Sequence, residues 1–245
     1  MVSVNIRRFF GNVLDWIYPP VCVSCGKPGA LICEECLSKL PAAGDHYCSV
    51  CGKPLKKNHY CRLCGRSGFR FGAARAPYLY DGPVSAMIKK LKFGGMMSLA
   101  PILSGLLAEY WKSLDWETDL IVPVPLSRKS QAQRGFNQSE LIARHFGKAV
   151  GVPCKPGALM KQRETKQQVG LNAEERRINL SGSFAAEKSY IKDKRILLLD
   201  DVMTTGSTFS ECSAVLLDTG AKSVRCLSVA TTSEDHGKQK MSDAL

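Results

Sequence analysis

The chain has 245 residues, 44% of them hydrophobic and 23% charged, which is ordinary for a folded protein of one or two domains and excludes a disordered one. Thirty-four Lys and Arg against 22 Asp and Glu give a formal net charge of +12. No run approaches about 18 apolar residues, and no secretory signal pattern stands at the start, so we expect a cytoplasmic protein without a transmembrane segment. Cysteines should then be metal ligands or buried thiols, not disulfides.

Residues 1–18 are predicted to form an amphipathic helix that Pro19-Pro20 ends. Its apolar residues recur at helical spacing: Ile6, Phe9, Phe10, Val13, Leu14 and Ile17. Such a stripe usually packs on its own protein. Because Arg7 and Arg8 accompany it, contact with a partner or with the inner face of the membrane is the alternative.

Eight of the 11 cysteines lie before residue 65, in four C-x-x-C pairs separated by 7, 11 and 9 residues. The pairs are Cys22/Cys25, Cys33/Cys36, Cys48/Cys51 and Cys61/Cys64. Each pair places two thiolates on one tight turn, and two pairs complete a tetrahedral zinc site. We therefore predict a double zinc ribbon over residues 19–70 with two structural Zn²⁺ ions, and four successive pairs argue against a redox motif.

The spacing leaves the ligand pairing open, since neighbouring pairs could each form a site or the first and third pairs could interleave. His46 and His59 stand beside these turns, but with eight thiols available we expect them to be exposed. Eight thiolates and two Zn²⁺ lower the net charge from +12 to about +8. The ribbon has few apolar residues, so metal must supply its stability.

Two functions are open for the ribbon. It could serve only to fold and dock, or its basic residues could bind nucleic acid. Those residues are Lys53, Lys56, Lys57, Arg62, Arg66 and Arg70.

Residues 71–235 have the composition of an α/β domain, and 236–245 are expected to be a flexible tail. Strands are predicted at 119–125, 158–160, 195–200 and 224–230, and helices at 139–150 and 209–219. This alternation predicts a parallel sheet flanked by helices. Ligands of such sheets bind beyond the carboxyl ends of the strands.

The predicted strand at 195–200 leads into a segment rich in polar and small residues. Asp200 and Asp201 come first, and a loop of hydroxyl-bearing residues then opens a helix. Backbone N–H groups, hydroxyls and a helix N-terminus together form a phosphate cradle. The carboxylates would repel phosphate unless they serve vicinal sugar hydroxyls, directly or through Mg²⁺. The pattern therefore predicts a ribose 5-phosphate site. Its loop residues are Thr204, Thr205, Gly206, Ser207 and Thr208.

The string from Ile196 to Thr208 resembles the 5-phosphoribosyl-1-diphosphate (PRPP) signature of type I phosphoribosyltransferases. The resemblance implies that Asp200 and Asp201 hold the ribose 2- and 3-hydroxyls, with Mg²⁺ accompanying PRPP, and that the loop binds the 5-phosphate. Enzymes for 6-oxopurines carry Asp at the position of Thr204. A hypoxanthine or guanine acceptor is therefore disfavoured.

Further motifs, from about residue 19 to 230, resemble the competence protein ComF family, which includes GntX-like proteins. They are Tyr80-Asp-Gly-Pro-Val84, Leu91-Lys-Phe-Gly-Gly95, Val122-Pro-Val-Pro-Leu126, Arg134-Gly-Phe-Asn-Gln138, and the segment with Arg163, Thr165, Gln168 and Arg176. The resemblance implies a type I phosphoribosyltransferase-like α/β fold preceded by a small zinc-ribbon domain. It also implies that the loop after Pro125 faces the diphosphate and that residues 162–184 form a mobile loop over the site.

Charge supports a polyanion site independently of that resemblance. Residues 128–180 carry 11 Lys and Arg against 4 Asp and Glu, a local +7, whereas residues 181–245 carry a local −1. The basic residues that coincide with the motifs are Arg128, Lys129, Arg134, Arg163 and Arg176. We expect them to surround the phosphates.

The resemblance to ComF implies a PRPP-binding protein that handles single-stranded DNA in the cytoplasm during natural transformation, with competence machinery proteins as partners. Against DNA binding, the only aromatic candidates for base stacking near the basic segments are Phe69, Phe71 and Phe136. The alternatives are a phosphoribosyltransferase for a small acceptor, or a PRPP-sensing regulator. No residue identifies an acceptor or a general base, so turnover is left open.

Overall fold

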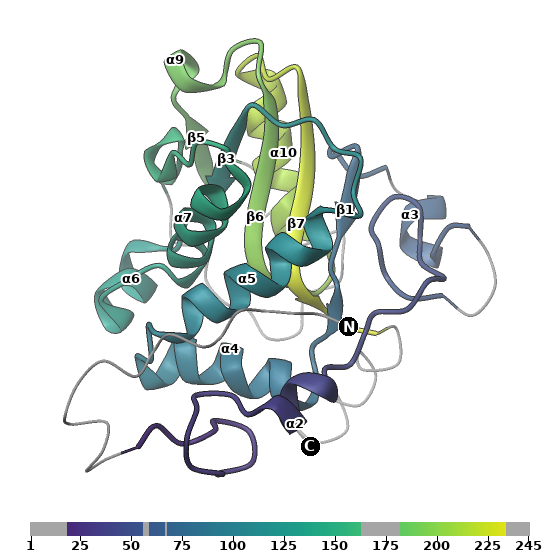
Figure 1. Ribbon diagram of the computed structural model, residues 1–245. Coiled ribbons are helices and arrows are strands. Elements are labelled where there is room, and N and C mark those ends of the chain that lie inside the picture. Colours follow the sequence, from purple (N-terminus) through teal and green to yellow (C-terminus); the bar gives the residue numbers. More distant parts are fainter. Residues whose placement is uncertain (1–18, 56–58, 67, 163–181, 234–245) are drawn as a thin grey trace, which may run out of the picture.

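A computed structural model describes residues 19–55, 59–66, 68–162 and 182–233 (Figure 1). The predicted N-terminal helix and C-terminal tail lie outside the described residues, and so do Arg163, Arg176, Lys56 and Lys57. In the part of the chain that is described, no helix is both long and apolar enough to cross a membrane.

The main sheet is entirely parallel, in the order β1-β7-β6-β3, with β2 on the same edge of β7 as β1. A second, antiparallel pair joins β4 and β5. The bounds are β1 Ala73–Arg75, β2 Tyr78–Leu79, β3 Leu120–Pro123, β4 Leu159–Lys161, β5 Phe184–Ala186, β6 Arg195–Met203 and β7 Ser223–Thr231. The four predicted strands are present as β3, β4, β6 and β7. Because β6 is three residues longer than predicted, Asp201 lies within the strand together with Asp200, the last residue of the predicted strand.

The two predicted helices are present as α7 and α10, whereas α4 and α5 were not among the predicted elements. The bounds are α2 Glu34–Ser38, α3 Arg62–Arg66, α4 Gly82–Gly94, α5 Leu99–Trp111, α6 Arg128–Arg134, α7 Gln138–Val150, the 3-10 turn Pro156–Ala158, α9 Lys188–Ile191 and α10 Ser207–Asp218. Helix α4 begins where Asp81 accepts a hydrogen bond from Gly82 N–H, and it ends at Gly95 in the left-handed conformation (φ 63°).

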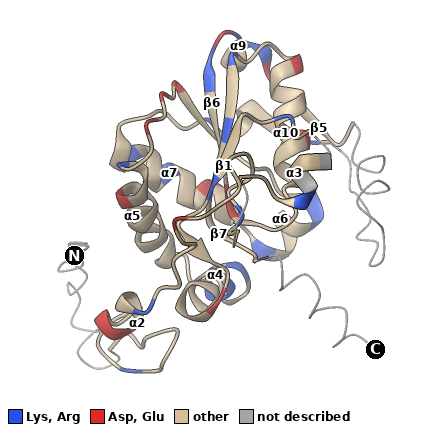
Figure 2. Ribbon diagram, turned by 90° about the vertical axis from the view of Figure 1, so that its right-hand side faces the viewer, with Lys and Arg blue, Asp and Glu red and all other residues tan. Residues whose placement is uncertain are grey.

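Helices cover both faces of the sheet because side chains alternate along each strand. On β6, Leu197 and Leu199 belong to a buried cluster with α4, α5 and α7. Ile196 and Leu198 belong to a second cluster with α10 and β5. We call these sides the α4 face and the α10 face. Figure 2 views the sheet nearly edge-on, with α5 and α7 on one side and α10 on the other.

The cysteine-rich segment divides between these two faces. The first cysteine module, residues 22–36, contributes Cys22, Ile32 and Cys36 to the cluster of the α4 face. The second cysteine module, residues 48–64, contributes Cys48, Cys51 and Cys61 to the cluster of the α10 face. Helices α2 and α3 accordingly lie well apart, on opposite sides of the sheet (Figures 1 and 2). Each module is therefore stabilised by packing on the α/β core as well as by metal.

Candidate functional site: two cysteine clusters and a carboxylate–phosphate cradle

The structure brings the eight cysteines together as two separate groups. The groups are Cys22, Cys25, Cys33 and Cys36, and Cys48, Cys51, Cys61 and Cys64. Within each group the four Sγ atoms lie within 4.8 Å of one another. A tetrahedral zinc ion with Zn–S bonds of about 2.3 Å needs sulfur atoms roughly 3.8 Å apart, so both groups fit the metal. Sequential pairing is thereby confirmed, and the interleaved arrangement is wrong.

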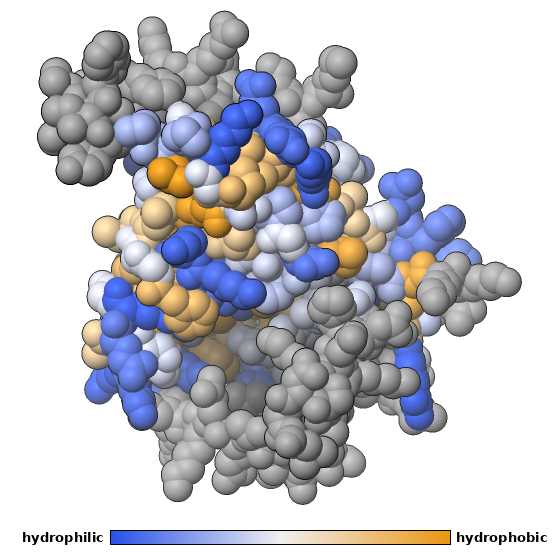
Figure 3. All heavy atoms as spheres, turned by 90° about the horizontal axis from the view of Figure 1, so that it is seen from below, coloured by the Kyte–Doolittle hydropathy of each residue, from blue (hydrophilic) through white to orange (hydrophobic). Residues whose placement is uncertain are grey.

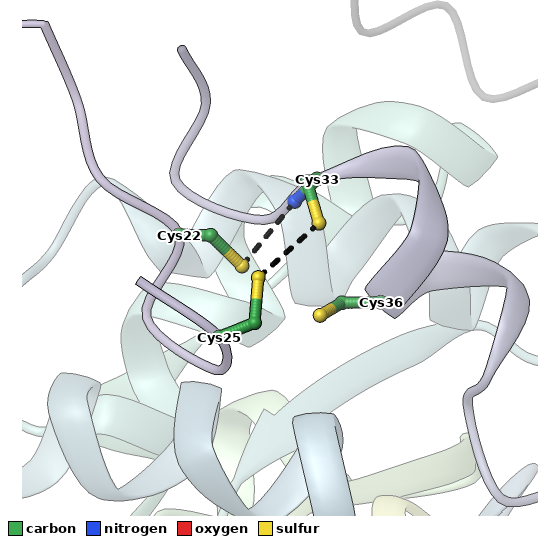
Figure 4. Close-up of side chains that lie close together, drawn as sticks. All are labelled: Cys22, Cys25, Cys33 and Cys36. Carbon is green, nitrogen blue, oxygen red and sulfur yellow. Dashed lines mark hydrogen bonds between the residues drawn. The ribbon is translucent and has the colours of Figure 1, made fainter. Parts of the chain in front are cut away.

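Figure 4 shows the four thiols of the first module pointing toward a common centre. The Sγ atoms of Cys25 and Cys33 are 3.6 Å apart, and the same distance separates those of Cys51 and Cys61 in the second module. His46 and His59 belong to neither group and are exposed, as predicted.

The thiols cannot all ionise without a cation. Burial alone would raise the pKa of Cys22, but backbone N–H groups of Cys25 and Cys33 lower it to about 6. Burial and neighbouring thiols raise the pKa of Cys36 and of Cys51 to about 12. A bound Zn²⁺ supplies the positive charge that makes four thiolates compatible with one another.

The carboxylate pair lies in β6 directly after Leu199, where the pairing with β3 ends and the pairing with β7 continues. Asp200 Oδ1 accepts hydrogen bonds from the Ser139 hydroxyl at 2.6 Å and from the Asp201 N–H at 2.9 Å. Burial and the adjacent Asp201 carboxylate raise the pKa of Asp200 above its ordinary value. Its side chain is therefore held in place, and a cation or hydroxyl donors would favour its charged form.

Asp201 is 2% exposed and has a partner that sequence reasoning did not identify. Lys92, in the last turn of α4, forms an ion pair with its Oδ2 atom. Gln138 Nε2 lies 3.5 Å from Asp201 Oδ1. The only signal for Lys92 was its place in the Leu91-Lys-Phe-Gly-Gly95 motif, because nothing in the spacing places α4 beside β6.

The Arg134-Gly-Phe-Asn-Gln138 motif has a local structural role. Asn137 caps α7 by accepting a hydrogen bond from Ser139 N–H at 3.0 Å, and its amide donates to the Val124 carbonyl. Arg134 donates to Gln138 Oε1 at 2.9 Å. The arginine predicted to face a polyanion is therefore engaged in holding the side chain that contacts Asp201.

The phosphate loop joins β6 to α10. Gly206 has φ 82°, which favours glycine, and it offers no side chain to cap the first N–H groups of the helix. The hydroxyls of Thr205 and Ser207 are 2.9 Å apart, while Thr204 and Thr208 are exposed. The Ser207 N–H donates to the Thr205 hydroxyl at 3.4 Å, and Gly206 itself supplies no side-chain cap. A twelve-residue helix that begins with N–H groups and hydroxyls in this arrangement is a suitable anion site.

Residues 69–71, which follow the second cysteine module, pack against the phosphate loop. A Cβ atom placed on Gly206 would lie 3.3 Å from the Phe69 ring. Phe69 stacks on Phe71 with a centroid distance of 4.8 Å, and Phe71 meets Phe209 of α10 edge-on at 6.4 Å. The Arg70 N–H donates to the Ser210 hydroxyl at 3.2 Å. The segment that follows the second module is thus packed directly on the loop that was predicted to bind phosphate.

The other basic residues that were predicted to bind a polyanion or nucleic acid differ in their exposure and in their partners. Arg128 and Lys129 are exposed and begin a short helix, α6, where a loop was predicted. Lys53 is 8% exposed, so its assignment to a basic surface of the ribbon is wrong. Arg70 pairs with Asp218 at 3.0 Å, and Arg62 is exposed.

Comparison with known families agrees with both parts of this arrangement. The model of the double zinc ribbon domain matches residues 13–65, and that of the phosphoribosyl transferase domain matches residues 102–244. Among solved structures, a glutamine PRPP amidotransferase from B. subtilis is 20% identical, with a TM-score of 0.38 over 54% of this chain and 26% of that chain. An adenine phosphoribosyltransferase from Leishmania tarentolae is 17% identical, with a TM-score of 0.38 over 64% of this chain and 65% of that chain.

The molecule is thus a phosphoribosyltransferase-type α/β fold that carries a double zinc ribbon. Competence protein F of Haemophilus influenzae is 29% identical over 81% of this chain and 83% of its own. DNA utilization protein YhgH of Escherichia coli K12 is 31% identical, over 86% and 88%. Competence protein ComFC of Bacillus subtilis is 27% identical, over 79% and 81%. The chain belongs to this ComF family.

Proposed function

We propose that the protein binds PRPP together with Mg²⁺ and handles single-stranded DNA in the cytoplasm during natural transformation. The observation that carries the first part is the β6–α10 turn, where two carboxylates precede a left-handed glycine that begins a twelve-residue helix without a side-chain cap of its own. Asp200 and Asp201 would accept hydrogen bonds from the ribose hydroxyls, and their oxygens suit Mg²⁺. The loop from Thr204 to Thr208 would hold the 5-phosphate.

The DNA part of the proposal is supported by the relatives and by charge. The relatives are called competence proteins and DNA utilization proteins. The chain has a formal net charge of +12, and residues 128–180 contribute a local +7. A basic protein gains most of its affinity for a single strand by neutralising phosphates, so binding should weaken with salt by a log–log slope near −0.7 per phosphate.

The PRPP site is tested by calorimetric titration with and without Mg²⁺. Asp200→Asn with Asp201→Asn should weaken PRPP at least about tenfold, because hydrogen bonds to ionised groups contribute about 1.5–3 kcal/mol each. Inorganic diphosphate, which has no ribose, should bind the parent and this variant about equally. Asp45→Asn with Asp115→Asn changes the same number of charges at exposed carboxylates and is the matched control.

Unchanged PRPP affinity in the Asp200→Asn, Asp201→Asn variant would show that these side chains do not hold the ribose. DNA handling is tested by the salt dependence of oligonucleotide binding. A protein that consumes PRPP with a small amine or base and shows no salt-sensitive DNA binding would make it a phosphoribosyltransferase instead.

A further inference from the structure

Phe93, at the end of α4, is exposed although it is a large aromatic residue. Its exposed fraction is 74%, the highest of any large hydrophobic residue in the described parts of the chain. Helix α4 buries Val84, Met87, Ile88 and Leu91 along a different stripe, so Phe93 is not needed for packing. Gly94 and Gly95 follow it, so no bulky side chain adjoins the ring on its C-terminal side in sequence.

One cation is already held over this ring. The guanidinium carbon of Arg134 lies 5.2 Å from the Phe93 centroid. Arg134 is fixed by its hydrogen bond to Gln138, which also contacts Asp201. Lys92, the neighbour of Phe93 in sequence, pairs with the same Asp201. The exposed ring therefore lies at the rim of the carboxylate site.

The helix surface beside Phe93 carries two exposed lysines. Residues 82–108 contain three lysines and no Asp or Glu, and two of those lysines, Lys89 and Lys90, are exposed. They precede Phe93 by four and three residues, so all three side chains neighbour one another on the helix surface. Lys92 is neutralised by Asp201, which leaves Lys89 and Lys90 to attract an anion. Figure 3, from below Figure 1, shows strongly hydrophilic and apolar residues side by side on this end of the molecule.

The aromatic residues singled out from the sequence do not offer an open ring. Phe71 is 4% exposed, Phe69 is stacked on it against the phosphate loop, and Phe136 packs partly buried against the core of the α4 face. Among the exposed aromatic residues that the structure describes, Phe93 offers the most open ring, ahead of Tyr60 at 58% and Tyr190 at 42%.

We propose that Lys89, Lys90 and Phe93 form a base-stacking platform for single-stranded DNA. A base stacks on the open surface of Phe93, and the lysines neutralise flanking phosphates. Exposed aromatic rings among cations bind single strands in this way, whatever the sequence, because every base has a stacking face. A strand on this platform passes along the rim of the ribose-phosphate site. The inference rests on the DNA part of the proposed function.

The test compares two labelled strands of about 20 nucleotides, oligothymidylate and its abasic counterpart, by fluorescence anisotropy. Phe93→Ala should weaken the binding of oligothymidylate at least about fivefold and that of the abasic strand less than about twofold, because only a base can stack. Phe93→Trp should restore binding. Tyr190→Ala is the matched control, since Tyr190 is 42% exposed with Lys155 Nζ 5.3 Å from its centroid, at the other end of the sheet. Tyr190→Ala should change the affinity for neither strand.

The two lysines are tested separately, by the salt dependence of DNA binding. Lys89→Gln with Lys90→Gln should make the salt slope shallower by about 0.7 per lysine on both strands, whereas Phe93→Ala should leave the slope unchanged. If the parent does not bind oligothymidylate, the DNA part of the proposed function is wrong. If the parent binds and Phe93→Ala affects neither strand, or both equally, the stacking platform alone is wrong.

Discussion

The two cysteine modules have nearly the same local backbone structure but pack against different parts of the molecule. In each, the first cysteine N–H donates to the carbonyl of a lysine five residues later, at 2.8 Å, and a glycine in the left-handed conformation follows the second cysteine. The first module packs on the α4 face, whereas the second packs on the α10 face and leads through Phe69 to Gly206 of the phosphate loop. Similar metal sites therefore support different parts of the molecule.

The contacts around each cysteine module, and not the cysteine motif itself, determine which part of the molecule the module holds in place. Cys22 and Cys36 are buried among apolar side chains of α4 and α5. Cys48 and Cys61 are buried among Phe71 and Phe209, which flank the start of α10. Loss of zinc from one module should therefore have consequences that loss from the other does not.

The largest expected effect comes from removing a zinc ligand. Cys22→Ser and Cys48→Ser, at matched buried positions, should each lower the zinc content from about two to about one ion per chain. Cys48→Ser should weaken PRPP binding at least about tenfold, because Phe69 is no longer held against the loop. Cys22→Ser should weaken PRPP binding by less than about threefold. Metal analysis and calorimetry measure both.

Hydrogen exchange provides a readout that does not depend on PRPP. Cys48→Ser should speed exchange at residues 205–210, and Cys22→Ser at residues 84–91. If both variants speed exchange in the same segments, the two modules do not stabilise different faces of the sheet.

The sequence predicted the zinc ligands and the core strands because both are local signals. A C-x-x-C spacing specifies a turn, and four consecutive apolar residues, Ile196 to Leu199, specify a buried strand. It did not predict the ligand pairing or the contact of Phe69 with Gly206, since the latter joins residues far apart in the chain. The polyanion role of Arg134 stays a prediction, while the contacts of its guanidinium with Gln138 and Phe93 are visible only in the structure.

Lys92 connects the α4 face to the carboxylate pair, and its removal should have the next largest effect. The side chains of Lys92 and Asp201 are 18% and 3% exposed, so Lys92→Met leaves a buried carboxylate without its cation. We expect a loss of about 3 kcal/mol in the free energy of unfolding, measured by urea titration. Lys92→Met combined with Asp201→Asn should recover about half of it. Simple additivity of the two changes would show that the pair is not coupled.

A glycine in each module differs in how closely the sheet approaches it. Gly26 and Gly52 have φ of 80° and 67°, so alanine at either is strained, by roughly 1–2 kcal/mol. A Cβ on Gly26 meets nothing within 4 Å, whereas one on Gly52 would lie 2.4 Å from the Ala74 carbonyl oxygen of β1. Gly52→Ala should therefore lower the melting temperature by about 8 °C and Gly26→Ala by about 4 °C. Equal shifts in zinc-loaded protein would mean that the second module is not tightly seated on the sheet.

The smallest expected effect concerns a carboxylate of the α10 face. Both carboxylate oxygens of Glu211 are buried and lack a hydrogen-bond partner among the residues that the structure describes. Burial raises the pKa of Glu211 from 4.5 to about 8, against a small opposing effect of Lys161.

Because the folded protein holds this proton more tightly than the unfolded chain, the contribution of Glu211 to stability is complete below about pH 4.5 and is lost as the pH rises through about 8. Glu211→Gln keeps the shape and cannot ionise, so the variant should match the parent near pH 5 and exceed it by about 1 kcal/mol near pH 8.5, a figure reduced for partial exposure. Glu109→Gln, at an exposed carboxylate of α5 that pairs with Lys112 on the other face, should leave the pH dependence unchanged. Urea titrations at the two pH values measure the difference. Parallel stability curves for the parent and Glu211→Gln would show that Glu211 is ionised in the folded protein and that the α10 face supplies it with a partner.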